Sequence, residues 1–165
     1  MDNVYLLIGG NLGNRVENLE NAIGLINTRA GQIIRTSVIY ETAAWGITDQ
    51  KSFLNQALEL DTSHPPTILL DIILEIEREL GRIRREKNGP RLIDIDILFY
   101  GSSIIADPRL TVPHPLLQER RFALAPMNNI SPDFIHPAFN KTVKQLLAEC
   151  KDPLRVEPYQ ATTGE

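Results

Sequence analysis

The sequence has little of three things that mark special classes of protein: cysteine, long apolar runs and net positive charge. Its one cysteine, Cys150, excludes a disulfide within the chain and fits a reducing compartment. No apolar run approaches the roughly 18–20 residues that a helix needs to span a bilayer. Asp2 and Asn3 stand where a secretory signal carries positive charge. We therefore expect a cytoplasmic protein with no membrane partner.

The charge balance argues against one further class of protein. The formal net charge is −4 and the pI is near 5.4, whereas a general nucleic-acid binder is usually basic overall. A chain of 165 residues is long enough for one domain with a substantial core. We expect that domain to occupy residues 1–155 and to be monomeric, with a disordered polar tail over residues 156–165.

One predicted buried strand, residues 92–100, carries two acidic residues. Its composition is apolar and partly β-branched, yet Asp94 and Asp96 interrupt it. Side chains two apart in a strand share a face and lie roughly 6.5–7 Å apart, so the intervening isoleucines point into the core. Two like charges on a half-buried sheet repel unless something neutralises them, and Mg²⁺ prefers such oxygen ligands. The alternative is a solvated edge strand with two exposed acids.

A cationic segment runs directly into this strand. Residues 82–91 carry a formal charge of +4, with Arg82, Arg84, Arg85, Lys87 and Arg91 against Glu86. Arginines clamp phosphate oxygens, and carboxylates hold the cations that bridge those oxygens. The two segments together predict a metal–polyphosphate site, with Asp94 and Asp96 as the metal ligands.

The rest of the pattern predicts an α+β domain. A strand over residues 4–8 is followed by a helix that Asn14 caps, and the later elements are strands at 32–40 and 53–61, a helix at 66–80 and the strand at 92–100. This β-α-β-β-α-β order is that of a ferredoxin-like fold, with a mainly antiparallel sheet and both helices on one face. The carboxylates then lie on the uncovered face.

A C-terminal extension of short strands and helices follows this core. We expect a short strand within residues 102–110, a short helix at 118–125, a proline-punctuated loop at 126–140 and a final helix at 142–150.

The strand at 53–61 carries a second candidate site. Leu54 and Leu58 alternate with Phe53 and Asn55, so an aromatic ring and an amide share a face. That pair suits a flat heterocycle, which needs both stacking and hydrogen bonds at its edge. The alternative is a core phenylalanine and an asparagine tied to a loop backbone.

Several motifs resemble one family. Residues 89–98, Gly-Pro-Arg-Leu-Ile-Asp-Ile-Asp-Ile-Leu, match the signature of the 6-hydroxymethyl-7,8-dihydropterin pyrophosphokinases of folate biosynthesis, and the Gly-x-Asn-Leu turn at 9–12 is similar as well. Further matches in order and spacing are Glu41-Thr42, Trp45-Gly46, Phe53-Leu54-Asn55, Gly81-Arg82-x-Arg84, Leu110-Thr111-Val112-Pro113-His114 and Arg120-x-Phe122. The resemblance covers residues 4–150.

The resemblance implies an ATP- and Mg²⁺-dependent transferase. ATP gives its β,γ-diphosphate to the hydroxymethyl group of 6-hydroxymethyl-7,8-dihydropterin and leaves as AMP, with two Mg²⁺ ions held by Asp94 and Asp96. The residues implied for catalysis are Arg82, Arg91, Asp94 and Asp96. Those implied for ATP are Arg82, Arg84, Arg91, Ile97, Thr111, His114 and Arg120. Those implied for the pterin are Thr42, Ala43, Trp45, Phe53, Asn55, Asp94 and Phe122.

Three positions depart from the family pattern. Many relatives place tryptophan where this chain has Asn88, some place leucine at Trp45, and some place tyrosine at Pro115. We therefore expect Trp45 to supply part of the aromatic cover of the pterin.

Three other functions compete with this assignment. They are a non-catalytic ferredoxin-like binding module, RNA binding on the open sheet face, and a phosphoryl transferase with another acceptor. The coincidence of two aspartates with arginines disfavours the first, and carboxylates on the sheet face would repel the phosphates of RNA. Only the pterin-side residues disfavour the third.

Overall fold

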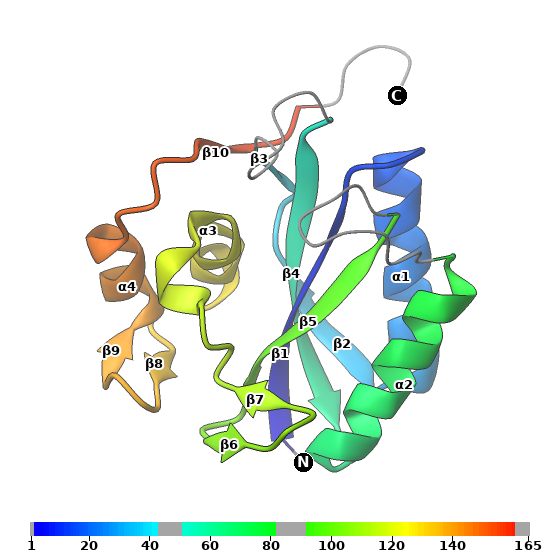
Figure 1. Cartoon of the computed structure of the whole chain (residues 1–165), viewed down its shortest axis with the longest axis horizontal. Coiled ribbons are helices and arrows are strands. Elements are labelled where there is room, and N and C mark those ends of the chain that lie inside the picture. Colours follow the sequence, from blue (N-terminus) through cyan, green and yellow to red (C-terminus); the bar gives the residue numbers. More distant parts are fainter. Residues whose placement is uncertain (1, 43–50, 82–91, 161–165) are drawn as a thin grey trace.

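A six-stranded antiparallel sheet forms the centre of the computed structural model, which describes residues 2–42, 51–81 and 92–160 (Figure 1). The strands are β1 Asp2–Gly10, β2 Gln32–Thr36, β3 Tyr40–Thr42, β4 Phe53–Thr62, β5 Asp94–Tyr100 and β10 Val156–Pro158. They lie in the order β10-β3-β4-β1-β5, with β2 also paired to β4. Each of these pairings is antiparallel. The predicted α+β, ferredoxin-like fold is confirmed.

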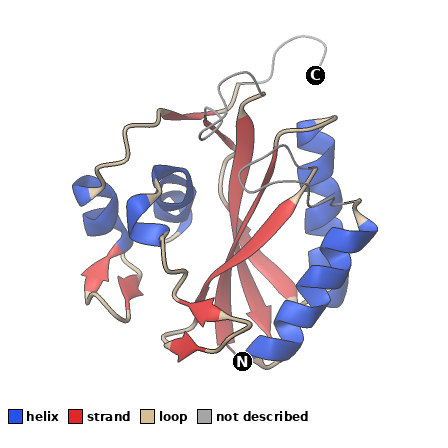
Figure 2. Ribbon diagram, in the orientation of Figure 1, coloured by secondary structure: helices blue, strands red, loops and turns tan. Residues whose placement is uncertain are grey.

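Two helices, α1 Arg15–Arg29 and α2 Pro66–Glu79, cover one face of the sheet (Figure 2). α1 begins where the N–H of Glu17 donates a 3.1 Å hydrogen bond to the side chain of Asn14, the N-cap that the sequence predicts. α2 ends before Gly81, whose φ of 83° suits glycine.

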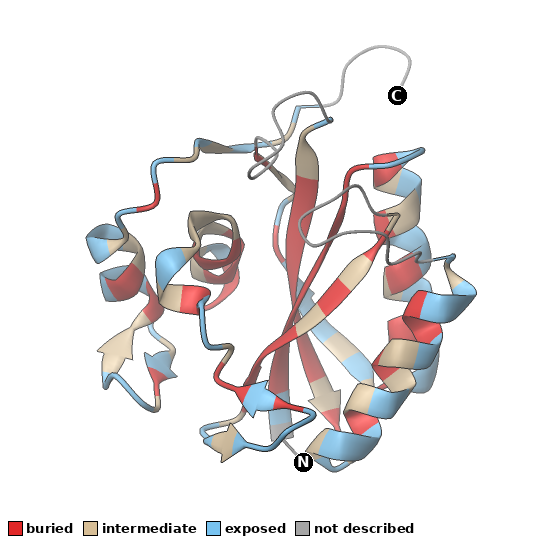
Figure 3. Cartoon of the chain, viewed as in Figure 1, coloured by how far each residue is buried: buried red, intermediate tan, exposed pale blue. Residues whose placement is uncertain are grey.

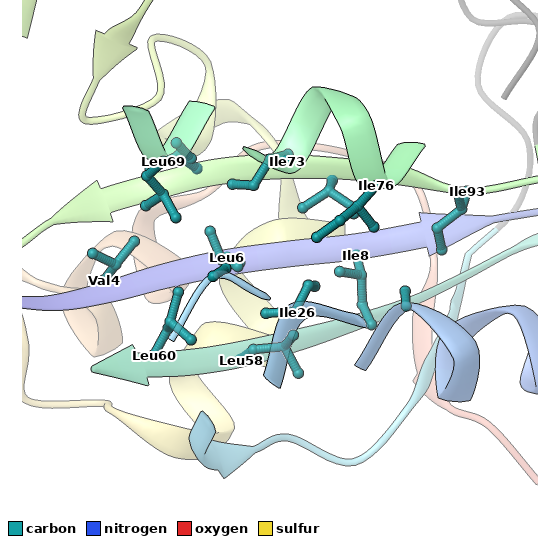
Figure 4. Packing of buried hydrophobic residues seen from close by; sticks show 14 of the residues in the cluster. Val4, Leu6, Ile8, Ile26, Leu58, Leu60, Leu69, Ile73, Ile76 and Ile93 are labelled. Atoms are coloured by element: carbon teal, nitrogen blue, oxygen red, sulfur yellow. The ribbon is translucent and has the colours of Figure 1, made fainter. Parts of the chain in front are cut away.

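The larger apolar core lies between these helices and the sheet (Figure 4). Its central members are fully buried, and they include Val4, Leu6, Ile8, Ile26, Leu58, Leu60, Leu69 and Ile76. The predicted alternation along β4 is confirmed, because Leu54 and Leu58 belong to this core while Ala57 belongs to the opposite face. In Figure 3 burial follows the central strands, and the outward sides of the helices are exposed.

The opposite face of the sheet carries a second core, so it is only partly open. Tyr5, Leu7 and Ala57 pack there against two further helices, α3 Arg121–Ile130 and α4 Val143–Glu149. The expectation of an uncovered face is wrong for this half of the sheet, since those apolar side chains need cover. The other half, where β1 ends and β5 begins, holds the cavity described below.

A β-bulge lets β5 serve both cores. Leu6 pairs with Ile97 and Tyr5 pairs with Phe99, which leaves Leu98 as an extra residue on β5. Ile97 consequently lies in the core under α1 and α2, and Leu98 and Phe99 both lie in the second core.

α3 is longer than the helix predicted at 118–125. It runs through Pro126 to Ile130, although a proline beyond the first turn removes a hydrogen bond. The predicted loop therefore begins too early. A buried stripe that includes Ala123 and Met127 stabilises the helix and outweighs that loss.

Short elements complete the extension. They are the predicted strand β6 Ile105–Ala106 with its partner β7 Thr111–Val112, the 3-10 turn Leu117–Glu119, and the hairpin of β8 Ile135–His136 with β9 Lys141–Thr142. Within the described part of the chain, no helix has the length and apolar composition that crossing a membrane requires.

Two further elements differ from expectation at the edge of the sheet. The strand predicted at 32–40 is divided into β2 and β3 near Ser37, whose hydroxyl accepts a hydrogen bond from the N–H of Ala57. In the tail predicted to be disordered from residue 156, β10 instead pairs with β3, and the N–H of Tyr159 donates to the carbonyl of Ile39. Strand pairing satisfies this backbone, which is a long-range effect that composition does not show.

We predict that Leu58→Ala lowers the free energy of unfolding by about 2–5 kcal/mol, because it leaves a cavity in the core between α1 and the sheet. Urea denaturation followed by circular dichroism measures the loss. Ile34→Ala is the matched control, since Ile34 is 48% exposed on the same sheet and its truncation should cost less than about 0.5 kcal/mol. Equal losses in the two variants would contradict the assignment of the core.

Candidate active site

A cavity of about 720 Å³ opens where β1 ends and where β4 and β5 begin. The strand residues that line it are Leu7, Gly9, Thr42, Phe53, Asn55, Asp94 and Asp96. The C-terminal extension supplies the remaining wall, with Leu116, Gln118, Glu119, Arg120, Phe122, Glu149, Lys151, Asp152 and Leu154. The two sites that the sequence predicts, the carboxylate pair and the aromatic–amide pair, are thus parts of one cavity.

Strand register brings those two pairs together across Gly9. Gly9 is the direct partner of Asn55 on one side and of Asp94 on the other. A Cβ at Gly9 would lie 2.2 Å from Oδ1 of Asn55 and 2.8 Å from the carbonyl oxygen of Leu54. Only glycine at this position therefore leaves room for the Asn55 side chain over β1, the strand that lies between Asn55 and Asp94.

The two aspartates lie on the same side of β5, as predicted. Both are half-buried and line the cavity, whereas Ile95 and Ile97 are buried in the core on the other side. The neighbouring strand β1 pairs with both of them, since Gly9 is the partner of Asp94 and Leu7 is the partner of Asp96. The alternative of a solvated edge with two exposed acids is not what the structure shows.

A buried carboxylate supports β5 from the face of the sheet that α2 covers. Glu77 of α2 is 4% exposed and accepts a 2.7 Å hydrogen bond from the N–H of Ile95, the residue between the two aspartates. Because β5 is an edge strand in the described part of the chain, the N–H of Ile95 finds no further strand there to pair with. Glu77 supplies the acceptor and so fastens the aspartate-bearing end of β5 to α2.

Aromatic and polar groups complete the lining of the cavity. Phe53 and Phe122 both line the cavity, and the Arg120 guanidinium lies 5.5 Å from the centroid of the Phe122 ring. Thr42 is 3% exposed, and among the described residues its hydroxyl has no hydrogen-bond partner. A buried polar group of this kind requires a partner, so the Thr42 hydroxyl is suited to bind a ligand.

His114 lies beside a small hollow that adjoins the cavity and shares Asp96, Arg120 and Phe122 with it. Its Nδ1 accepts a hydrogen bond from the N–H of Leu116, which leaves the ring proton on Nε2. The pKa of His114 is lowered to about 4, mainly by burial and in addition by the Arg120 charge, while Asp94 opposes the shift. At neutral pH the ring is therefore an uncharged hydrogen-bond donor.

The Gly-x-Asn-Leu turn and the residue that begins α1 form hydrogen bonds to segments distant in the chain. The buried side chain of Asn11 donates to the carbonyl of Lys51, and Arg15 donates to a carboxylate oxygen of Glu41 at 3.0 Å and to Ser52. The hydrogen bond from Ser52, together with Arg15, lowers the pKa of Glu41. The turn thus contacts the residues that precede β4, and the first residue of α1 joins them to β3.

The structure brings together seven of the residues that the resemblance implies: Thr42, Phe53, Asn55, Asp94, Asp96, Arg120 and Phe122. His114 lies at the adjoining hollow. Ile97 packs in the core and Thr111 lies exposed on β7, so neither side chain lines the cavity, and their contact with ATP stays a prediction. The predictions for Arg82, Arg84, Arg91, Ala43 and Trp45, like that for Asn88, fall outside the described residues.

Several residues at the cavity escaped the sequence analysis. Gln118, Glu119, Lys151 and Asp152 stand in no motif, and Glu77 resembles any other acid on the surface of a helix. Their places depend on contacts between segments far apart in the chain. The one available signal was that Glu77 lies on the buried side of α2, next to Ile76 and Ile73.

Comparison with known proteins connects this cavity to one family. A family model described as 7,8-dihydro-6-hydroxymethylpterin-pyrophosphokinase (HPPK) matches residues 5–132. A relative from Methylorubrum extorquens, named 2-amino-4-hydroxy-6-hydroxymethyldihydropteridine pyrophosphokinase, is 39% identical over 158 residues, which are 95% of this chain and 98% of that protein. A relative of the same name from Aquifex aeolicus is 42% identical over 149 residues, 90% of this chain and 92% of that protein.

A solved structure has the same fold. A crystal structure of Plasmodium falciparum HPPK-DHPS matches 90% of this chain with a TM-score of 0.73 and 20% sequence identity. This chain spans 43% of that longer protein. At that identity the likeness concerns the fold alone.

We predict that Glu77→Met speeds hydrogen exchange of the Ile95 amide by about tenfold or more, because loss of a hydrogen bond worth about 1.4 kcal/mol corresponds to a tenfold change. Exchange measured by NMR tests this. Glu77→Gln is the matched control, since its amide oxygen still accepts from Ile95 and protection should persist. Equal exchange in the Met and Gln variants would contradict the support of β5 by Glu77.

We predict that the free energy of unfolding falls as the pH drops from about 6.5 to about 4, partly through His114. In that window the unfolded chain binds a proton at His114 that the folded protein does not bind, so acid favours unfolding. His114→Gln should give a shallower decline in urea denaturation measured across this range. A decline as steep as in the parent protein would contradict the assigned environment of His114.

Proposed function

The chain belongs to the 7,8-dihydro-6-hydroxymethylpterin-pyrophosphokinase family, and from this premise we infer that it transfers pyrophosphate to 6-hydroxymethyl-7,8-dihydropterin in folate biosynthesis. ATP is the donor, and AMP is the second product. One observation carries the assignment of the site: a single cavity collects the carboxylate pair of β5 and the aromatic–amide pair of β4 on either side of Gly9.

The β4 side of the cavity is suited to the pterin. Its ring would stack between Phe53 and Phe122, which both line the cavity. Asn55 and Thr42 would hydrogen-bond the polar edge of the ring, and the unpartnered Thr42 hydroxyl supports this role. The resemblance adds Ala43 and Trp45 to this side, and Asp94 as a metal ligand that also touches the pterin.

The β5 side of the cavity is suited to the triphosphate. Arg120 would contact phosphate oxygens with its charge, and neutral His114 would donate from Nε2. We assign the same task to Arg82, Arg84 and Arg91 of the cationic segment, and nucleotide contacts to Ile97 and Thr111. Of these, Arg82 and Arg91 would also stabilise the charge that moves onto the leaving AMP.

The aspartates fit Mg²⁺. Among the described residues no group of three or more His, Cys, Asp or Glu side chains forms a protein-only metal site. Mg²⁺ does not require one, because it commonly binds one or two carboxylates and takes its other ligands from phosphates and water. Asp94 and Asp96, half-buried on one side of β5, provide that donor set for two ions. When bound, Mg²⁺ would supply positive charge that neutralises the phosphate oxygens.

The chain's own contribution to the reaction is positioning. The hydroxymethyl oxygen of the pterin forms a bond to the β-phosphorus of ATP and loses its proton, while the bond from that phosphorus to the α,β-bridging oxygen breaks. Phe53, Phe122 and Asn55 orient the acceptor, and Arg120 and His114 orient the donor. Such transfer depends mainly on orientation and charge neutralisation.

Two wider properties belong to the same proposal. We assign the protein to the cytoplasm and propose that it acts as a monomer on small-molecule substrates. Nucleic acid is not a partner in this proposal, because the acidic pair occupies the sheet face that RNA would need.

We predict that the protein converts ATP and 6-hydroxymethyl-7,8-dihydropterin to AMP in the presence of Mg²⁺, and that EDTA abolishes the reaction. Asp96→Ala should lower turnover by at least about 10²-fold with an unchanged circular dichroism spectrum, because it removes a carboxylate that would hold the Mg²⁺ that neutralises the transferring charge.

Asp71→Ala is the matched control, since Asp71 is an acid that is 52% exposed on the outside of α2. It should leave turnover unchanged. AMP release by Asp96→Ala at the parent rate would refute the metal role, and ADP as the product would refute pyrophosphate transfer.

A further inference from the structure

One wall of the cavity is built by residues 149–154, which lie beyond the segment that the family model matches. This segment, named here the C-terminal wall, includes the end of α4 and the residues that lead toward β10. Figure 1 shows α4 beside α3, with the chain then passing to β10, which lies beside β3. The C-terminal wall therefore belongs to the folded domain and lines its cavity.

Two side chains join the C-terminal wall to the start of α3. One oxygen of the Asp152 carboxylate accepts from the N–H of Arg121 at 3.1 Å, and the other accepts from the N–H of Leu154 at 3.0 Å. The Arg121 guanidinium donates to the carbonyls of Cys150 and Asp152, each at 3.0 Å. Asp152 is 8% exposed, so these bonds lie largely out of water.

This arrangement satisfies an end of α3 that lacks a local cap. The N-terminal N–H groups of a helix need acceptors, and Arg120, at the N-cap position, offers no side-chain hydrogen bond. Asp152 provides an acceptor from 31 residues away, and its negative charge suits the positive end of the helix. The contact therefore determines where the backbone of Arg121 lies.

Arg121 stands between two residues of the site. Arg120 and Phe122 line the cavity on either side of it, and they contact each other as a cation over a ring. Any shift of the Arg121 backbone moves both the ring that would stack on the pterin and the charge that would meet the phosphates. A displacement of about 1 Å in such a site lowers reaction rates by up to about 10²-fold.

We propose that Arg121 and Asp152 are positioning residues, which hold Arg120 and Phe122 in place for the two substrates. The proposal rests on the proposed function, because it names the task of the neighbouring residues in that reaction. It assigns to the C-terminal wall a role in substrate affinity as well as in stability. Neither residue touches the reacting atoms.

The test compares Asp152→Ala with Thr142→Ala. Thr142 caps α4 through a hydrogen bond from the N–H of Gln145 and does not line the cavity, so its loss removes a helix cap of the same kind away from the site. Both variants should lose some thermal stability. Only Asp152→Ala should raise the KM for the pterin, by about tenfold, and lower kcat/KM by up to about 10²-fold.

Asp152→Asn completes the series. One amide oxygen replaces two carboxylate oxygens, so it can still accept from Arg121 and should recover part of the lost kcat/KM. The same ranking is expected in the equilibrium binding of 6-hydroxymethylpterin, followed by the fluorescence of the pterin itself.

The outcomes separate the two hypotheses. If the parent protein forms AMP and the pterin KM and affinity are equal in Asp152→Ala and Thr142→Ala, the positioning role is overturned while the proposed function stands. If the parent protein forms no AMP, the proposed function fails. A selective loss of pterin binding in Asp152→Ala would in that case still support the positioning of Phe122.

Discussion

The site depends on the lack of a side chain at Gly9. β1 is the strand between β4 and β5, and Gly9 is paired to Asn55 on one of them and to Asp94 on the other. Because a Cβ there would collide with the Asn55 side chain, any larger residue would push the amide away from the carboxylate side of the cavity. The acceptor side and the donor side of the proposed reaction are therefore adjacent only because the central strand has no side chain at this position.

The two faces of the sheet are used differently, and this difference creates the cavity. The face under α1 and α2 carries the larger apolar core, and Glu77 of α2 supports β5 from that side. The opposite face is apolar at one end, where Tyr5 and Phe99 pack against α3 and α4, and polar at the other, where the aspartates lie. Since α3 covers only the apolar end, the polar end remains accessible to substrates.

Local patterns predicted the parts of the site but not its walls. The alternation of Phe53 and Asn55 with leucines, and of Asp94 and Asp96 with isoleucines, placed both pairs on one side of their strands. The course of α3 through Pro126 was not predictable from local rules, because a buried apolar stripe overrides the proline. The strand β10 was not predictable from local rules either, because its pairing with β3, which is distant in the chain, stabilises a polar segment.

The sequence by itself determined the fold class, the faces of β4 and of the aspartate-bearing half of β5, and the chemical types at the site, because period-2 alternation and helix caps involve neighbours in the chain. It also carried the family resemblance in its short motifs. Only the tertiary structure decided that Asp152 caps α3, that Glu77 supports β5 and that Gly9 brings Asn55 and Asp94 together. These contacts join residues distant in the chain, and a buried hydrogen bond or a strand register selects its partner only when the whole domain packs.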